Sequence, residues 1–152
     1  MSVSWRYLNP FVQPITVGEE SIDGLGHANN TAYIVWCETT AWRHSAQLGL
    51  TLIDCQRLGR AMAIVRGEYD YLVAARTGDQ LSVATWLTAS DRKLSLERRF
   101  QIVRNTDGKT LFAGRWQLVC IDIASGRPAR LPPEFIEVYV GNLIEICRGT
   151  DD

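Results

Sequence analysis

The sequence predicts an α+β domain in which one long helix lies across an antiparallel sheet. A helical apolar pattern covers residues 29–47, and four segments rich in β-branched and aromatic residues follow it. The dipeptide Asp107-Gly108 separates two of these segments and is a strong hairpin signal, so the sheet there is antiparallel. A single helix and such strands bury their apolar faces when the helix lies on the concave face of the sheet.

The long helix is expected to begin near Asn29 and to end near Gln47, where Gly49 stops it. Apolar residues occupy nearly every side of its first half. A helix with that pattern is usually enclosed by other structure rather than laid on a surface. We also expect a strand before Asp23, so that the helix follows a strand and a turn.

The four strands are expected at residues 61–75, 81–89, 94–104 and 110–123. The third shows the clearest period of two, with apolar Leu96, Phe100 and Ile102 on one face, and Arg98 interrupts that face. Helical spacing returns at residues 133–146, with proline at the first turn of the expected helix. No repeat, low-complexity run or linker interrupts this order.

The bulk properties indicate one domain spanning residues 1–152. A formal charge of -1, from 16 basic and 17 acidic residues, does not mark the surface as a nucleic-acid binder. The four cysteines are scattered, and there is neither a signal peptide nor an apolar run long enough to cross a membrane. The sequence thus predicts a cytoplasmic protein with free thiols.

The segment that leads into the long helix carries the candidate chemistry. Asp23 stands on a turn with glycines at 24 and 26, and the expected helix begins a few residues later. Glycine permits backbone angles closed to other residues, and a helix start offers unpaired N–H groups with partial positive charge. A carboxylate and an oxyanion donor are therefore expected to face one small volume.

Each of these residues also has a structural interpretation. Asp beside Gly is a common turn residue and can cap a helix, and the same holds for Asn29 and Asn30. His27 can satisfy a backbone group, and with His44 so distant in the sequence no metal site is predicted.

Basic and acidic residues elsewhere are equally open to a structural interpretation. For Glu38, in the middle of the apolar helix, we expect an ion pair with Arg43 or with an arginine of the sheet. Arg92 and Lys93 on a strand turn, with the arginines of the following strand, could hold a phosphate, although a solvated face is the default.

Taken together, Asp23-Gly-Leu-Gly-His27-Ala-Asn29-Asn30-Thr-Ala-Tyr33 followed by Glu38 resembles the signature of hotdog-fold thioesterases of the 4-hydroxybenzoyl-CoA thioesterase type. The resemblance implies a hotdog fold, a curled antiparallel sheet around one long helix. It also implies hydrolysis of an acyl-CoA thioester to a carboxylic acid and coenzyme A. No separate cofactor is then needed, since coenzyme A is part of the substrate.

The resemblance assigns a role to each matching residue. Asp23 would be the nucleophile or general base, and the backbone amide of Asn30 would polarise the thioester carbonyl. Substrate contacts are expected from His27, Asn29 and Tyr33. Contacts to the coenzyme A phosphates are expected from two basic residues of a strand turn, Arg92 and Lys93.

The resemblance further implies a homodimer or a dimer of dimers, with the site between protomers, and an exposed sheet edge independently favours pairing. Two other functions stay open: a hotdog domain that binds acyl-CoA or assembles without turnover, and a hydratase or dehydratase. The spacing of Asp23 and His27 is one residue shorter than hydratases typically show. Aromatic, short and long acyl groups all remain candidates.

Overall fold

The structure is a computed structural model that describes residues 3–146. Its elements, in chain order, are β1 (Phe11–Thr16), η1 (Glu19–Ser21), α1 (Asn30–Leu48), α2 (Leu52–Leu58), β2 (Arg60–Tyr71), β3 (Gln80–Ala89), β4 (Ser95–Arg104), β5 (Thr110–Asp122), α3 (Pro133–Tyr139) and η2 (Val140–Asn142).

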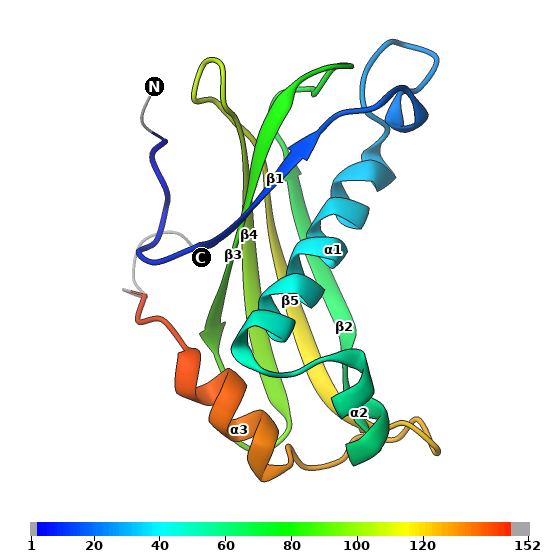
Figure 1. Ribbon diagram of the computed structural model, residues 1–152, viewed down its shortest axis with the longest axis vertical. Helices are drawn as coiled ribbons and strands as arrows, with labels where there is room; N and C mark the ends of the chain where they lie inside the picture. Colours follow the sequence, from blue (N-terminus) through cyan, green and yellow to red (C-terminus); the bar gives the residue numbers. More distant parts are fainter. Residues whose placement is uncertain (1–2, 147–152) are drawn as a thin grey trace.

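The five strands form one antiparallel sheet in the order β1-β3-β4-β5-β2 (Figure 1). Hairpins join β3 to β4 and β4 to β5, and the second turns at Asp107-Gly108 as predicted. Both β1 and β2 are edge strands. Edge strand β1 is short and contains Pro14, which lacks a backbone N–H, whereas β2 has 12 residues.

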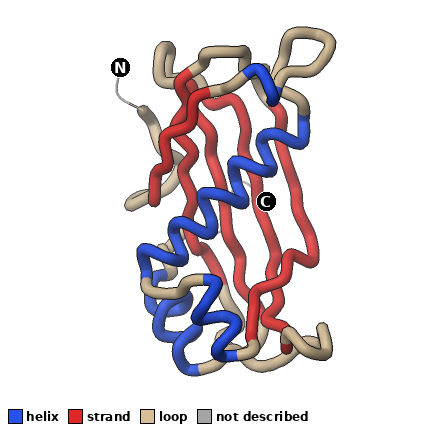
Figure 2. Tube along the Cα trace, turned by 45° about the vertical axis from the view of Figure 1, so that its right-hand side comes forward, coloured by secondary structure: helices blue, strands red, loops and turns tan. Residues whose placement is uncertain are grey.

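The long helix α1 runs along the concave face of the sheet, and Figure 2 shows it crossing the strands obliquely. Its buried side, which includes Trp36 and Cys37, packs with Phe112, Ile102 and Leu87 from the inner face of the sheet. Gly49 ends the helix in the left-handed conformation, with φ of 109°. The expected α+β hotdog arrangement, a curled sheet wrapped around one long helix, is confirmed.

The outer face of the sheet is partly covered by the segment before β1. Trp5 and Tyr7 contact the ring of Trp86 edge to face, at centroid distances of 6.2 and 5.2 Å. The Trp86 indole donates a hydrogen bond to the carbonyl of Leu8 at 3.1 Å. This cover explains why β3 and β4 are buried on both faces over much of their length.

Two predicted element ends were wrong. The strand expected at 61–75 ends at Tyr71. The residues after it form hydrogen bonds outside the strand ladder; the Ala75 carbonyl, for example, accepts from the Ala28 amide at 2.8 Å. The helix expected at 133–146 ends at Tyr139 and continues as the short η2, which contains Gly141. Ile146 is the last residue described.

Helix α2, which has seven residues between Gly49 and Gly59, was not predicted from the sequence. Its signal was present: Thr51 and Asp54 form a capping box, in which each side chain accepts from the other residue's backbone amide. Seven residues give too few apolar positions for a helical period to stand out.

Candidate active site

Asp23 holds the turn on which it lies. One oxygen of its carboxylate, Oδ1, accepts hydrogen bonds from the amides of Leu25 and His27 at 2.8 and 3.2 Å, and the Asp23 amide donates to the His27 carbonyl at 2.8 Å. Gly26 supplies a positive φ of 80° that closes the turn. The structural interpretation of Asp23 as a turn residue is therefore correct, and its side chain is nevertheless exposed.

The second carboxylate oxygen, Oδ2, accepts no hydrogen bond from any residue in the range 3–146. Two amides thus fix the orientation of the Asp23 carboxylate while one oxygen stays open to solvent. A carboxylate held in this way can accept a proton from water or attack a carbonyl carbon without first breaking the turn.

The start of α1 lies directly after this turn and is capped by Asn29. Its side-chain oxygen accepts from the Ala32 amide at 2.9 Å and from the Thr31 hydroxyl at 2.6 Å. The capping interpretation of Asn29 therefore holds for its side chain, and Asp23 does not cap the helix. This cap satisfies the amide of the third helical residue, and the amides of the first two helical residues are left without an intrahelical partner.

Asn30 is the first residue of α1. Its amide has no hydrogen-bond partner within the described part of the chain, whereas its carbonyl accepts from the Tyr71 hydroxyl at 2.9 Å. The helix macrodipole places partial positive charge at such an amide. The bond to Tyr71 ties this helix end to the end of β2.

Two more hydrogen bonds fix the turn against the helix start. The Asn29 amide donates to the Ser21 carbonyl and the Ala28 amide donates to the Ala75 carbonyl, each at 2.8 Å. Ile22 and Ala28 also form an isolated antiparallel bridge across the base of the turn. The structure thereby brings Asp23, His27, Asn29 and Asn30 together at one end of α1.

His27 is half-buried within the turn. Its backbone makes both hydrogen bonds to Asp23, and its imidazole donates or accepts none among residues 3–146. The ring is therefore free to contact a ligand.

Tyr33 lies one helical turn further on and is 3% exposed. Its ring stacks on Phe112 at 5.4 Å, and its hydroxyl accepts from the Ala75 amide at 2.9 Å. These two contacts hold the Tyr33 side chain in the core beside the helix start. A contact of Tyr33 with substrate stays a prediction.

Arg92 and Lys93 lie away from the other candidates. Both are exposed in the turn between β3 and β4, which is at the opposite end of the sheet from the end where β3 begins beside β1. Asp91 organises this turn by accepting hydrogen bonds from three backbone amides, and these bonds lower the pKa of its carboxyl. Within one protomer the structure does not bring this pair to Asp23.

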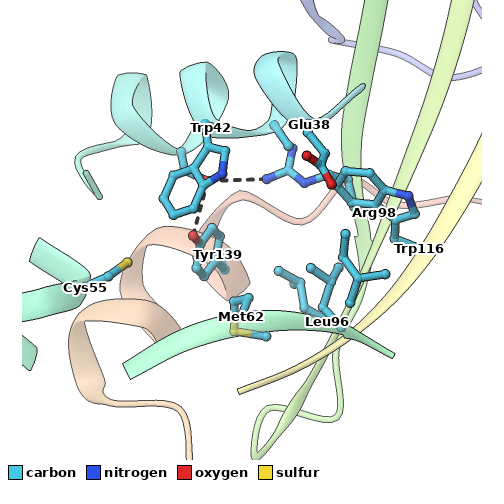
Figure 3. Close-up of a pocket in the computed structure, with 12 residues that line it drawn as sticks. Glu38, Trp42, Cys55, Met62, Leu96, Arg98, Trp116 and Tyr139 are labelled. Atoms are coloured by element: carbon cyan, nitrogen blue, oxygen red, sulfur yellow. Dashed lines mark hydrogen bonds between the residues drawn. The ribbon is translucent and has the colours of Figure 1, made fainter. Parts of the chain in front are cut away.

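A cavity of about 170 Å³ lies between the second half of α1 and the inner face of the sheet (Figure 3). Its lining residues come from α1, α2, α3 and three strands: Glu38, Ala41, Trp42, Ser45, Cys55, Met62, Ile64, Leu96, Arg98, Trp116, Leu118 and Tyr139. The walls are mainly apolar and aromatic, as in sites for small organic groups. Glu38 is the wall residue closest in sequence to the helix start.

Arg98 is the charged residue buried in this wall. The alternation in the sequence placed it on the apolar face of its strand, and a solvated face was the default for the arginines of that strand. Arg98 is 3% exposed. Burial lowers the pKa of its guanidinium to about 10, so the group still carries its charge at neutral pH. The period of two in β4 did point to the inner face, because Arg98 stands in line with Leu96 and Phe100.

Neither expected ion pair of Glu38 occurs among the described residues: it forms no salt bridge to Arg43 or to a sheet arginine, and its side chain is exposed. In the same range, no group of three His, Cys, Asp or Glu side chains is arranged to hold a metal ion. No helix within residues 3–146 is long and apolar enough to cross a membrane.

Comparison with known proteins gives a family match over most of the chain. The model of the thioesterase-like superfamily matches residues 17–138. No protein of curated function matches the chain.

Several solved structures share the fold. A 1,4-dihydroxy-2-naphthoyl-CoA thioesterase from Synechocystis superposes with a TM-score of 0.78 at 20% identity, covering 87% of this chain and 96% of that one. A DHNA-CoA thioesterase from Staphylococcus aureus gives 0.79 at 21% identity, covering 91% and 99%. A hypothetical protein from Staphylococcus aureus, solved in complex with CoA, gives 0.81 at 21% identity, covering 97% and 94%.

Proposed function

Since this chain belongs to the thioesterase-like superfamily, we propose that it hydrolyses an acyl-CoA thioester to a carboxylic acid and free coenzyme A. The observation that carries the proposal is the pairing at the start of α1. The oriented carboxylate of Asp23, with one open oxygen, lies beside a helix start whose Asn30 amide has no partner in the described chain. Thioester hydrolysis needs both groups.

In the proposed reaction the thioester carbonyl oxygen accepts a hydrogen bond from the Asn30 amide. Negative charge then grows on that oxygen as the carbonyl carbon becomes tetrahedral, and the positive end of α1 stabilises it. The open oxygen of Asp23 either removes a proton from the attacking water or attacks the carbon itself to give an anhydride that water opens. In both routes the C–S bond breaks and the coenzyme A thiolate leaves.

The free edge of β2 supports a dimer. Its central residues, from Ile64 to Glu68, are exposed, and Val65 is 61% exposed. An edge strand with exposed apolar residues is suited to pairing with another chain. We propose that two β2 strands pair antiparallel about a two-fold axis near Val65. The association of two such dimers into a dimer of dimers is part of the same proposal.

This pairing would complete the active site. Antiparallel strands centred near Val65 would place the end of one β2, at Tyr71, beside the start of the other. Tyr71 holds the helix start through the Asn30 carbonyl, and the first half of β2 supplies Met62 and Ile64 to the cavity. The Asp23 end of one protomer would therefore face the cavity of its partner.

The same arrangement supports the proposed coenzyme A contacts. The end of each sheet that carries Arg92 and Lys93 would then lie on the same side of the dimer as the partner's Asp23. Their positive charges suit the phosphates of a bound coenzyme A. The described cysteines, Cys37, Cys55 and Cys120, are buried and unpaired, which suits the cytoplasmic location that we propose.

The test measures thiol release from a panel of acyl-CoA substrates with a chromogenic disulfide. Asp23→Asn keeps an acceptor oxygen for the amides of Leu25 and His27, so the turn should survive while the basic carboxylate is lost. We expect kcat to fall by about 100- to 10,000-fold. Glu137→Gln, which makes the same carboxylate-to-amide change at an exposed position of α3, is the control and should keep the wild-type rate.

Equal rates for Asp23→Asn and wild type would remove Asp23 from its proposed role. If the wild type releases thiol from no substrate while acyl-CoA still raises its Tm, the protein binds acyl-CoA without turning it over.

A further inference from the structure

The buried guanidinium of Arg98 has only neutral partners in the described chain. It donates to Nδ1 of His44 at 2.9 Å, to the Thr85 hydroxyl at 3.1 Å and to the Ser45 hydroxyl at 3.5 Å. None of the salt bridges within residues 3–146 includes Arg98. A buried charge without an opposite charge is costly, so a site of this kind is suited to an anion that arrives with a ligand.

The groups around Arg98 leave its charge uncompensated. Burial, and next the charge of Arg98 itself, lower the pKa of His44 to about 4, so this imidazole is neutral at pH 7. Since an arginine can only donate, Nδ1 of His44 is an acceptor and its hydrogen is on Nε2. The Tyr139 hydroxyl donates to Ser45 at 3.1 Å and is also neutral, because burial raises its pKa.

Glu38 is the one acidic residue of the cavity wall. It is exposed and forms no salt bridge with Arg98 in the described chain, so its charge is solvated at the rim. An anion that reaches Arg98 must therefore pass the rim and bind deeper in the cavity.

The hydrogen-bonding capacity of Arg98 is not exhausted. A guanidinium has five N–H donors, and the three hydrogen bonds above use two from Nη1 and one from Nη2. Nε and the second hydrogen of Nη2 have no partner among the described residues. Two free donors on one guanidinium match the two oxygens of a carboxylate.

The rest of the cavity specifies the body of the ligand. Apart from Arg98 and Glu38 its walls are largely aliphatic or aromatic, with Trp42, Trp116 and Leu96 among them. A volume of about 170 Å³ is close to that of cavities that hold one benzene molecule. The site therefore has room for a single ring or a short chain, with a positive charge in its wall.

We propose that this cavity binds the distal end of an acyl group that carries a carboxylate, so that the substrate is a monothioester of a dicarboxylic acid with a short or single-ring body. This inference rests on the proposed thioesterase function and on the dimer in which Asp23 of one protomer faces the cavity of the other. In a single chain the cavity begins at Glu38, about 12 Å along α1 from Asn30. Arg98 determines specificity there and takes no part in bond breaking.

The test compares pairs of substrates with the same number of carbon atoms, which differ only in a carboxylate or a methyl group at the distal end. Succinyl-CoA is compared with butyryl-CoA, and 4-carboxybenzoyl-CoA with 4-methylbenzoyl-CoA. We expect the wild type to favour the carboxylate member of at least one pair by about 10- to 100-fold in kcat/KM, the range for hydrogen bonds to a charged group. This comparison uses only the wild-type protein, so it does not depend on whether a variant folds.

Arg98→Met then removes the charge and keeps an unbranched apolar side chain. It should abolish the preference by lowering kcat/KM for the carboxylate substrates, whereas Arg98→Lys should keep part of it. Arg127→Met, an exposed arginine in the loop after β5, is the matched control and should leave the preference unchanged. Equal loss for both members of a pair in Arg98→Met would mean that Arg98 only supports the fold.

A wild type that shows no preference within either pair, or that prefers the methyl-ended member of both pairs, overturns the inference and leaves the thioesterase function intact. A wild type that releases thiol from none of these four substrates and from no member of the wider acyl-CoA panel overturns the proposed function instead. Calorimetric binding of the same substrates then decides the inference separately: tighter binding of the carboxylate members, lost in Arg98→Met, supports it, and equal binding refutes it.

Discussion

The titration of His44 should control how the stability of this fold depends on pH. Burial and then the positive charge of Arg98 lower the pKa of His44 from 6.5 to about 4. Its ring stacks on Phe11 at a centroid distance of 5.0 Å, and its Nδ1 accepts from Arg98 at 2.9 Å. A proton on Nδ1 would face a guanidinium, so the folded chain binds that proton less readily than the unfolded chain does.

The lowered pKa makes the protein less stable in mild acid. Above pH 6.5 His44 is neutral in both states; as the pH falls from 6.5 towards 4, only the unfolded chain gains the proton and the free energy of unfolding drops. The pKa difference corresponds to about 2 kcal/mol at pH 5 relative to pH 8. Because the ring is only half-buried, screening reduces this to about 1–2 kcal/mol, or roughly 2–8 °C in Tm.

The perturbation is His44→Gln, which keeps an acceptor for Arg98 and removes the titrating group. Urea unfolding at pH 8 and pH 5 should show that the wild type loses about 1–2 kcal/mol more than the variant does. The carboxyl groups of the fold titrate equally in both proteins and cancel from the difference. Parallel pH curves for the two proteins would refute the reasoning, as would an NMR midpoint for the His44 ring near 6.5.

Two further predictions concern the segment that follows β2 and the free edge of β2 itself. Tyr33→Phe removes the acceptor for the buried amide of Ala75 and should lower the free energy of unfolding in urea by about 1–3 kcal/mol; a loss below about 0.5 kcal/mol would mean that the amide finds another partner. Val65→Lys places a charge at the centre of the free β2 edge and should give a monomer by light scattering, with thiol release reduced. A stable dimer of that variant would exclude this edge as the interface.

Much of the fold could be predicted from the sequence because its signals are local. The glycine at 49, the Asp107-Gly108 turn and the alternation in β4 each depend on neighbouring residues, and each appears in the structure where expected. The turn of Asp23 is equally local, since its carboxylate bonds to amides only two and four residues away.

Apart from the short helix α2, the features that were missed depend on distant parts of the chain. Residues 72–75 have strand-like composition, but they leave the ladder for partners such as Ala28 and Tyr33, which no local pattern reveals. The alternation placed Arg98 on the apolar face of its strand, but a solvated face was kept as the default because no partner for its charge could be identified from the sequence. Its hydrogen-bond partners lie on α1 and β3, and only the folded chain brings them together.

The two ends of α1 are therefore free to diverge separately in evolution. The turn of Asp23 is built by a few consecutive residues, so a descendant that keeps this short segment keeps its geometry. The cavity draws its walls from six elements, and a substitution in any one of them alters its shape or charge without touching that turn. A lineage with this layout can exchange one acyl preference for another while its reaction is inherited intact.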